Sequence, residues 1–68
     1  MHFEYDAEAD AVYLTLGAPV GPGEAVRQVT IEDGGIPRVI IDYDADDKIL
    51  GFEILDASRS LRSEDLGR

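Results

Sequence analysis

Cysteine is absent from this 68-residue chain, and histidine occurs once. The lack of cysteine excludes disulfide bonds and thiolate metal sites, and it fits a reducing compartment. No apolar run approaches the ~20 residues that a membrane helix needs. Residues Met1 to Glu4 also lack the basic and apolar segments of a signal peptide. The sequence therefore predicts a cytoplasmic protein without disulfides.

Basic residues are scarce as well. Six Lys and Arg stand against fifteen Asp and Glu, which gives a formal net charge of −9. Because such a field repels phosphate backbones and anionic lipid surfaces, we expect neither nucleic-acid binding nor membrane binding. The charge favours a basic protein partner or a cation, although solubility of a small domain explains it equally well.

The length of the chain allows one domain, residues 1–68. A domain of this size buries only about 60% of the surface that its unfolded chain exposes. The hydrophobic fraction of 44% is that of a globular protein. Since disulfides cannot supplement so small a core, we expect a partner subunit, and the sequence predicts a homo-oligomer.

Apolar and polar residues alternate with a period of two along most of the chain, which predicts β-strands. The strands are expected at residues 2–6, 11–16, 26–31, 39–43 and 49–54, between turns rich in glycine and aspartate. Pro37 suits the first position of a strand. The predicted fold is α+β, mainly β: an antiparallel meander of four to five strands with a short C-terminal helix. One face of the sheet buries the core and the other is wet and acidic.

The alternation also predicts the register of two hairpins. In the first, Tyr5 pairs with Val12, and the loop is centred on Glu8 and Ala9. In the second, Ile41 pairs with Leu50, and this register sets Arg38 opposite Glu53. Opposite charges across a ladder contribute about 0.2–1 kcal/mol.

The C-terminal segment breaks the alternation at Asp56. The side chain of Asp56 or Ser58 can cap a helix by accepting a backbone N–H. Leu61 and Leu66 are the only large apolar residues that follow. We expect a helix of about ten residues, marginal without packing, that ends near Gly67.

The acidic segment from Asp42 to Glu53 has much of the spacing of a calcium loop. However, Asp47 occupies the sixth position, where such loops require glycine, and the flanking segments are strand-like. We interpret the segment as a turn. The only histidine, His2, lies at the terminus, and no nucleophile or phosphate-binding motif is present. The sequence predicts no catalytic residues, no metal site, no cofactor and no enzymatic activity.

Two segments of the chain resemble domain-of-unknown-function family 2283. One is Tyr5 to Leu14; the other combines Ile41 to Asp44 with Lys48 to Ser58. The family typically has glycine in the last turn, where this chain has Asp47. The resemblance implies a small prokaryotic protein without an assigned activity. It also implies an antitoxin-like role, because family members often look like the second gene beside a small toxin-like ribonuclease domain.

Two functions remain open at this point. The first is a protein–protein interaction module, antitoxin-like, whose acidic sheet face covers the basic groove of a small ribonuclease. The residues expected to bind the partner are Glu4, Asp6, Asp42, Asp44 and Glu53. The second is a small metal- or ligand-binding domain that uses the acidic turns.

Overall fold

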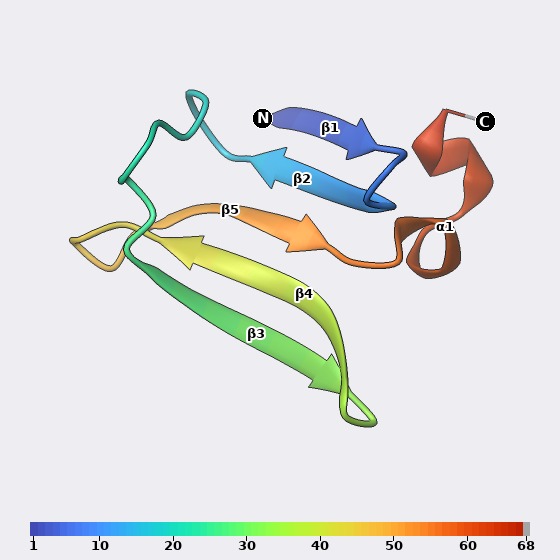
Figure 1. Cartoon of the computed structure of the whole chain (residues 1–68). Coiled ribbons are helices and arrows are strands. Elements are labelled where there is room, and N and C mark those ends of the chain that lie inside the picture. The colour runs from blue at the N-terminus through green and yellow to red at the C-terminus, as the bar shows by residue number, and fades with distance from the viewer. Residues whose placement is uncertain (68) are drawn as a thin grey trace.

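Five β-strands form one antiparallel sheet in the computed structural model, which describes residues 1–67 (Figure 1). They are β1 (His2–Asp6), β2 (Ala11–Thr15), β3 (Arg27–Asp33), β4 (Ile36–Tyr43) and β5 (Ile49–Ile54). A short α-helix, α1 (Ala57–Ser60), and a 3₁₀ helix, η1 (Ser63–Leu66), follow. The prediction of an antiparallel sheet with a short C-terminal helix is confirmed.

The strands do not lie in their sequence order. The order in the sheet is β1-β2-β5-β4-β3, so β3, β4 and β5 form a meander whose last strand pairs with β2. Residues 16–26 run past the ends of β5 and β4 to reach β3 at the far edge (Figure 1). Every residue of β3 is exposed, whereas β5 contributes the buried Gly51. The more polar strand therefore takes the edge, and the more apolar strand takes the centre.

The predicted register of the first hairpin is confirmed, with Tyr5 opposite Val12 and Phe3 opposite Leu14. In the second hairpin Ile41 pairs with Phe52, not with Leu50. The prediction was wrong by two residues, and a bulge between Asp42 and Tyr43 accounts for one of them. A shift of two residues leaves each side chain on the face where it was expected.

The corrected register also removes the expected pairing of Arg38 with Glu53. Glu53 lies opposite Ile40, and the backbone N–H of Leu55 donates to the carbonyl oxygen of Arg38 at 3.0 Å. The Arg38 guanidinium instead donates to Ser60 Oγ at 3.1 Å and lies 3.7 Å from Asp33. It therefore joins β4 to the C-terminal segment.

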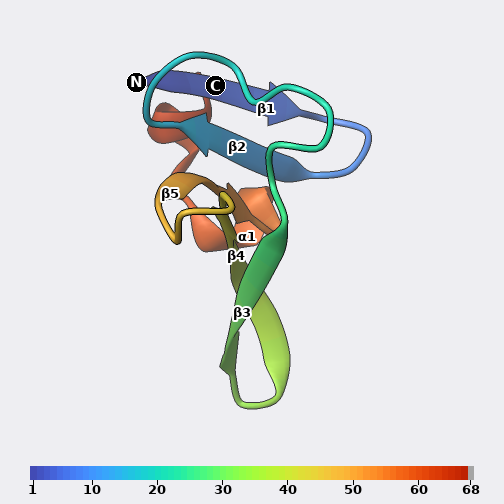
Figure 2. The same ribbon diagram turned by 90° about the vertical axis from the view of Figure 1, so that its left-hand side faces the viewer.

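The β3–β4 hairpin is longer than predicted and its turn is tighter. Gly34 and Gly35 both have positive φ, 59° and 81°, as a two-residue type I′ turn requires. Pairing continues to this turn, with Glu32 opposite Pro37. Because β5 pairs with β4 only from Val39 onward, the hairpin tip extends beyond the rest of the sheet (Figure 2). We call residues 29–38 the hairpin arm.

The C-terminal helix is shorter than predicted, and another residue caps it. Helix α1 has four residues, and Asp56 makes no side-chain cap. Asp10 takes this role from the β1–β2 turn, since its carboxylate accepts Ser58 N–H at 3.0 Å and Ser58 Oγ–H at 2.7 Å. Its carbonyl oxygen accepts Ala57 N–H at 2.8 Å. The helix ends at Ser60, and Leu61 has an extended backbone.

The core lies where this C-terminal segment meets β2. Val12 and Ala57 are fully buried, and Ala11 is 7% exposed. Alternation gives the sheet two faces. We call the side that carries Glu4, Asp6, Tyr13, Asp42 and Glu53 the acidic face, and the opposite side the apolar face. No helix within residues 1–67 is long and apolar enough to cross a membrane.

Candidate binding site on the acidic face

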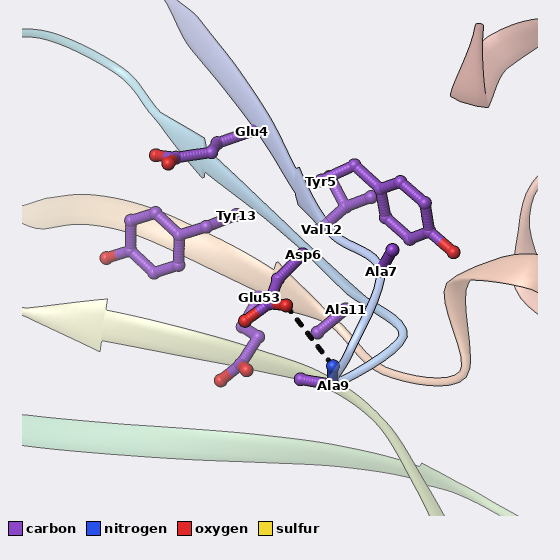
Figure 3. A pocket seen from close by; sticks show the side chains of 9 residues that line it. All are labelled: Glu4, Tyr5, Asp6, Ala7, Ala9, Ala11, Val12, Tyr13 and Glu53. Atoms are coloured by element: carbon purple, nitrogen blue, oxygen red, sulfur yellow. Dashed lines mark hydrogen bonds between the residues drawn. The ribbon is translucent and has the colours of Figure 1, made fainter.

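A hollow of about 500 Å³ opens on the acidic face between the β1–β2 turn and β5 (Figure 3). The carboxylates of Glu4, Asp6 and Glu53 surround it. Small side chains leave the space open, because three alanines lie among the residues that line it. These residues are Glu4, Tyr5, Asp6, Ala7, Ala9, Ala11, Val12, Tyr13 and Glu53.

Strand pairing explains why the three carboxylates lie around one hollow. Glu4 lies opposite Tyr13, and Tyr13 lies opposite Glu53, so the three side chains form one row across β1, β2 and β5. Asp6 ends β1, where its Oδ1 accepts the backbone N–H of Glu8 at 3.0 Å and of Ala9 at 3.3 Å. This Asx turn fixes the carboxylate of Asp6 at the rim of the hollow.

Tyr13 belongs to a hydrogen-bond network that holds the acidic face together. Its hydroxyl donates to Asp42 Oδ2 at 2.7 Å, and Gln28 Nε2 donates to Asp42 Oδ1 at 2.8 Å. Asp42 is only 8% exposed, so these bonds compensate for the burial of its charge. The network joins β2, β4 and β3 across β5.

The same surroundings keep Tyr13 protonated. Burial, the hydrogen bond to Asp42, and the negative charges of Asp42 and Glu53 raise the pKa of Tyr13 to about 12. Each cause disfavours a phenolate. Tyr13 therefore remains a hydrogen-bond donor at neutral pH and does not act as a base.

Gly51 makes room for the Tyr13 ring. A Cβ atom at residue 51 would lie 3.2 Å from Tyr13 Cε1 and from its hydroxyl oxygen, and it would overlap the carbonyl oxygen of Leu14. Only glycine lets the ring lie across β5 and reach Asp42. The sequence contains one signal of this arrangement, a glycine inside an otherwise apolar strand, but its meaning depends on the β2–β5 pairing.

The structure brings together three of the five residues predicted to bind a partner: Glu4, Asp6 and Glu53. Asp42 is buried in the Tyr13 network. Asp44 lies in the β4–β5 turn, where its Oδ1 accepts the backbone N–H of Asp46 at 2.8 Å and of Lys48 at 2.9 Å. Asp42 and Asp44 therefore stabilise the fold. The sequence patterns did not indicate that Tyr13 belongs to the site.

The carboxylates of the hollow have little compensation by positive charge. Residues 1–26 contain no lysine or arginine. Glu4 lies 3.9 Å from His2 Nε2, while within residues 1–67 neither Asp6 nor Glu53 forms an ion pair. The acidic face is therefore a region of negative potential.

The acidic turns do not assemble a metal site in the part of the chain that the structure describes. No group of three or more His, Cys, Asp or Glu side chains there is arranged to hold an ion. The spacing from Asp42 to Glu53 belongs to a β-hairpin, with Asp47 in the left-handed region at φ 62°.

A protein-family model matches residues 2–58, and its description is "protein of unknown function (DUF2283)". The chain belongs to this family. The resemblance seen in the sequence is thus confirmed, and DUF2283 spans all five strands and the beginning of α1. The acidic face and its hollow lie within the matched residues. No curated protein and no solved structure matches the chain.

Proposed function

We propose that this DUF2283 protein is a protein–protein interaction module whose acidic face binds a basic protein. The observation that supports the proposal is the hollow between Glu4, Asp6 and Glu53, which has carboxylates at its rim and little compensating charge. A face of one charge sign accelerates encounter with a partner of the opposite sign and rejects like-charged surfaces.

The chemistry of the hollow fits an arginine or lysine side chain. Its volume of about 500 Å³ is that of a small-ligand pocket. Glu4 and Glu53 flank the ring of Tyr13 in the strand register. A guanidinium group in the hollow would donate hydrogen bonds to a carboxylate on either side and lie against an aromatic face. An antitoxin-like role is one form of this function, in which the acidic face covers the basic substrate groove of a small ribonuclease.

The experiment compares two charge-matched variants in a pull-down from the native lysate at low and high salt, with mass spectrometry of the retained proteins. E4Q/E53Q removes charge beside the hollow. E32Q/E64Q removes the same charge from exposed positions that do not line the hollow, and both double variants change the formal net charge from −9 to −7.

We expect the wild type and E32Q/E64Q to retain a small basic protein that high salt releases. E4Q/E53Q should retain at least about tenfold less, because two carboxylates at the contact are lost. Recovery of the wild type without a basic partner, or equal retention by the two variants, contradicts the proposal.

A further inference from the structure

The apolar face of the sheet is largely uncovered. The C-terminal segment protects it only around Val12, which is fully buried. Farther along the same face Ile31 is 48% exposed and Phe3 is 44% exposed. The exposed large apolar side chains of this face and of the hairpin arm are Phe3, Leu16, Val29, Ile31 and Ile36. Exposed apolar side chains gathered on one face of a sheet mark an interaction surface.

The hairpin arm is the least supported part of this face. All seven residues of β3 are exposed, and Figure 2 shows the arm extending away from β1 and β2. From Glu32 to Pro37 the arm consists of two strands alone, because β5 pairs with β4 only from Val39 onward, and a two-stranded hairpin without further packing is at best marginally stable in water. The well-paired arm therefore fits a protein in which another surface packs against it.

The surface area of the chain is larger than that of a compact chain of the same mass. A compact chain of 7.4 kDa exposes roughly 4,200 Å², whereas this chain exposes 4727 Å². Its radius of gyration is 12.4 Å, against about 11 Å for a compact chain of the same length. The excess of about 500 Å² approaches the ~600–1,000 Å² that each partner buries in a stable dimer.

The chemistry of the face favours one kind of occupant. Its charged groups are paired: Arg38 with Asp33 at 3.7 Å, and Arg27 with Asp47 at 2.9 Å. A second hollow, of about 390 Å³, lies where the arm meets Leu61. The apolar residues that line it are Ile31, Val39, Ile54 and Leu61. Within residues 1–67, aspartates already pair with the two arginines that the strands contribute to this surface, so it is suited to an apolar surface like itself.

We propose that a second copy of this chain covers the apolar face, with the hairpin arms of the two copies packed around Ile31. A two-fold axis makes such a contact self-complementary. It also directs both acidic faces outward, so the carboxylates of the two copies stay apart. The contact uses the side of the sheet opposite the basic-partner site and does not depend on that proposal.

Salt separates the two interactions. Each copy carries a formal charge of −9, so screening weakens the repulsion between copies and strengthens the dimer. The same screening weakens binding of a basic protein to the acidic face. Loss of one interaction therefore does not imply loss of the other.

The test is sedimentation equilibrium of the full chain over a range of concentrations at low and high salt. We expect a dimer that tightens with salt. Ile31→Glu places a charge in each half of the contact and should raise the dimer dissociation constant at least ~100-fold. Thr30→Glu is the matched control, because Thr30 is also exposed on β3 but lies on the other face. It should leave the dimer intact.

Circular dichroism shows whether each variant is folded. Ile31→Thr preserves a β-branched side chain and should weaken the dimer by roughly tenfold even if the glutamate variant unfolds. A wild type that stays monomeric at about 100 μM, well above the dissociation constant of a specific dimer, overturns the proposal. Equal effects of Ile31→Glu and Thr30→Glu, or no effect of either, overturn it as well.

Discussion

The raised pKa of Tyr13 predicts that the protein loses stability at alkaline pH. The ordinary pKa of tyrosine is 10.0, and in the folded chain that of Tyr13 is raised to about 12. Between these values the unfolded chain loses the Tyr13 proton while the folded chain retains it. The contribution of Tyr13 to stability is therefore complete below pH 10 and is lost as pH rises through 12.

The magnitude follows from the size of the shift. A shift of one unit corresponds to about 1.36 kcal/mol, so a shift from 10.0 to about 12 sets an upper limit of ~2.7 kcal/mol. Because the Tyr13 side chain is half-buried, solvent screening reduces the expected value to about 1 kcal/mol. This is a measurable part of the ~3–10 kcal/mol expected for a domain of this length.

The assay is urea unfolding of the wild type and Tyr13→Phe at several pH values from neutral to alkaline. The phenylalanine variant lacks both the proton and the hydrogen bond to Asp42. We expect the wild type to be more stable by about 1 kcal/mol below pH 10, and this advantage to vanish near pH 12.

The phenolate difference spectrum between the two proteins gives an independent reading of the Tyr13 pKa. If the two proteins lose stability in parallel as pH rises, or if Tyr13 titrates as an ordinary tyrosine, the reasoning about its surroundings is refuted.

Two further substitutions test how the strands and the C-terminal segment are joined. Gly51→Ala should destabilise the protein by about 1–3 kcal/mol in urea unfolding, because the added methyl group overlaps the Leu14 carbonyl oxygen and crowds Tyr13. Unchanged stability contradicts the packing of Tyr13 over this glycine. Asp10→Ala removes the acceptor of the Ser58 amide and hydroxyl and should cost about 1–2 kcal/mol. Faster hydrogen exchange at the Ser58 amide should accompany this loss, and an unchanged exchange rate means that Asp10 does not hold the helix.

Local sequence patterns were sufficient for the first hairpin. Phe3 and Tyr5 face Val12 and Leu14 as predicted, because the turn is short and a one-residue slip would expose the whole apolar set. The same alternation placed Glu4 and Glu53 on the polar side. The alternation of apolar and polar residues therefore predicted two of the carboxylates of the hollow and the face that carries them.

Contacts between residues far apart in the chain could be found only from the tertiary structure. The pairing of β2 with β5 brings Tyr13 over Gly51, and no local pattern fixes which strand lies beside β2. The same pairing brings the β1–β2 turn near the helix, so Asp10 rather than Asp56 caps it. Prediction of a cap considers only neighbouring residues, whereas this donor and acceptor are separated by most of the chain.

The sequence by itself determined the strands, the first register and the separation of acidic from apolar side chains, since all three follow from short-range alternation and turn chemistry. Only the tertiary structure decided the strand order, the burial of Asp42 and the projection of the hairpin arm. These features depend on which surfaces remain uncovered once the chain is folded. A 68-residue chain has too little material to cover both faces of a five-stranded sheet.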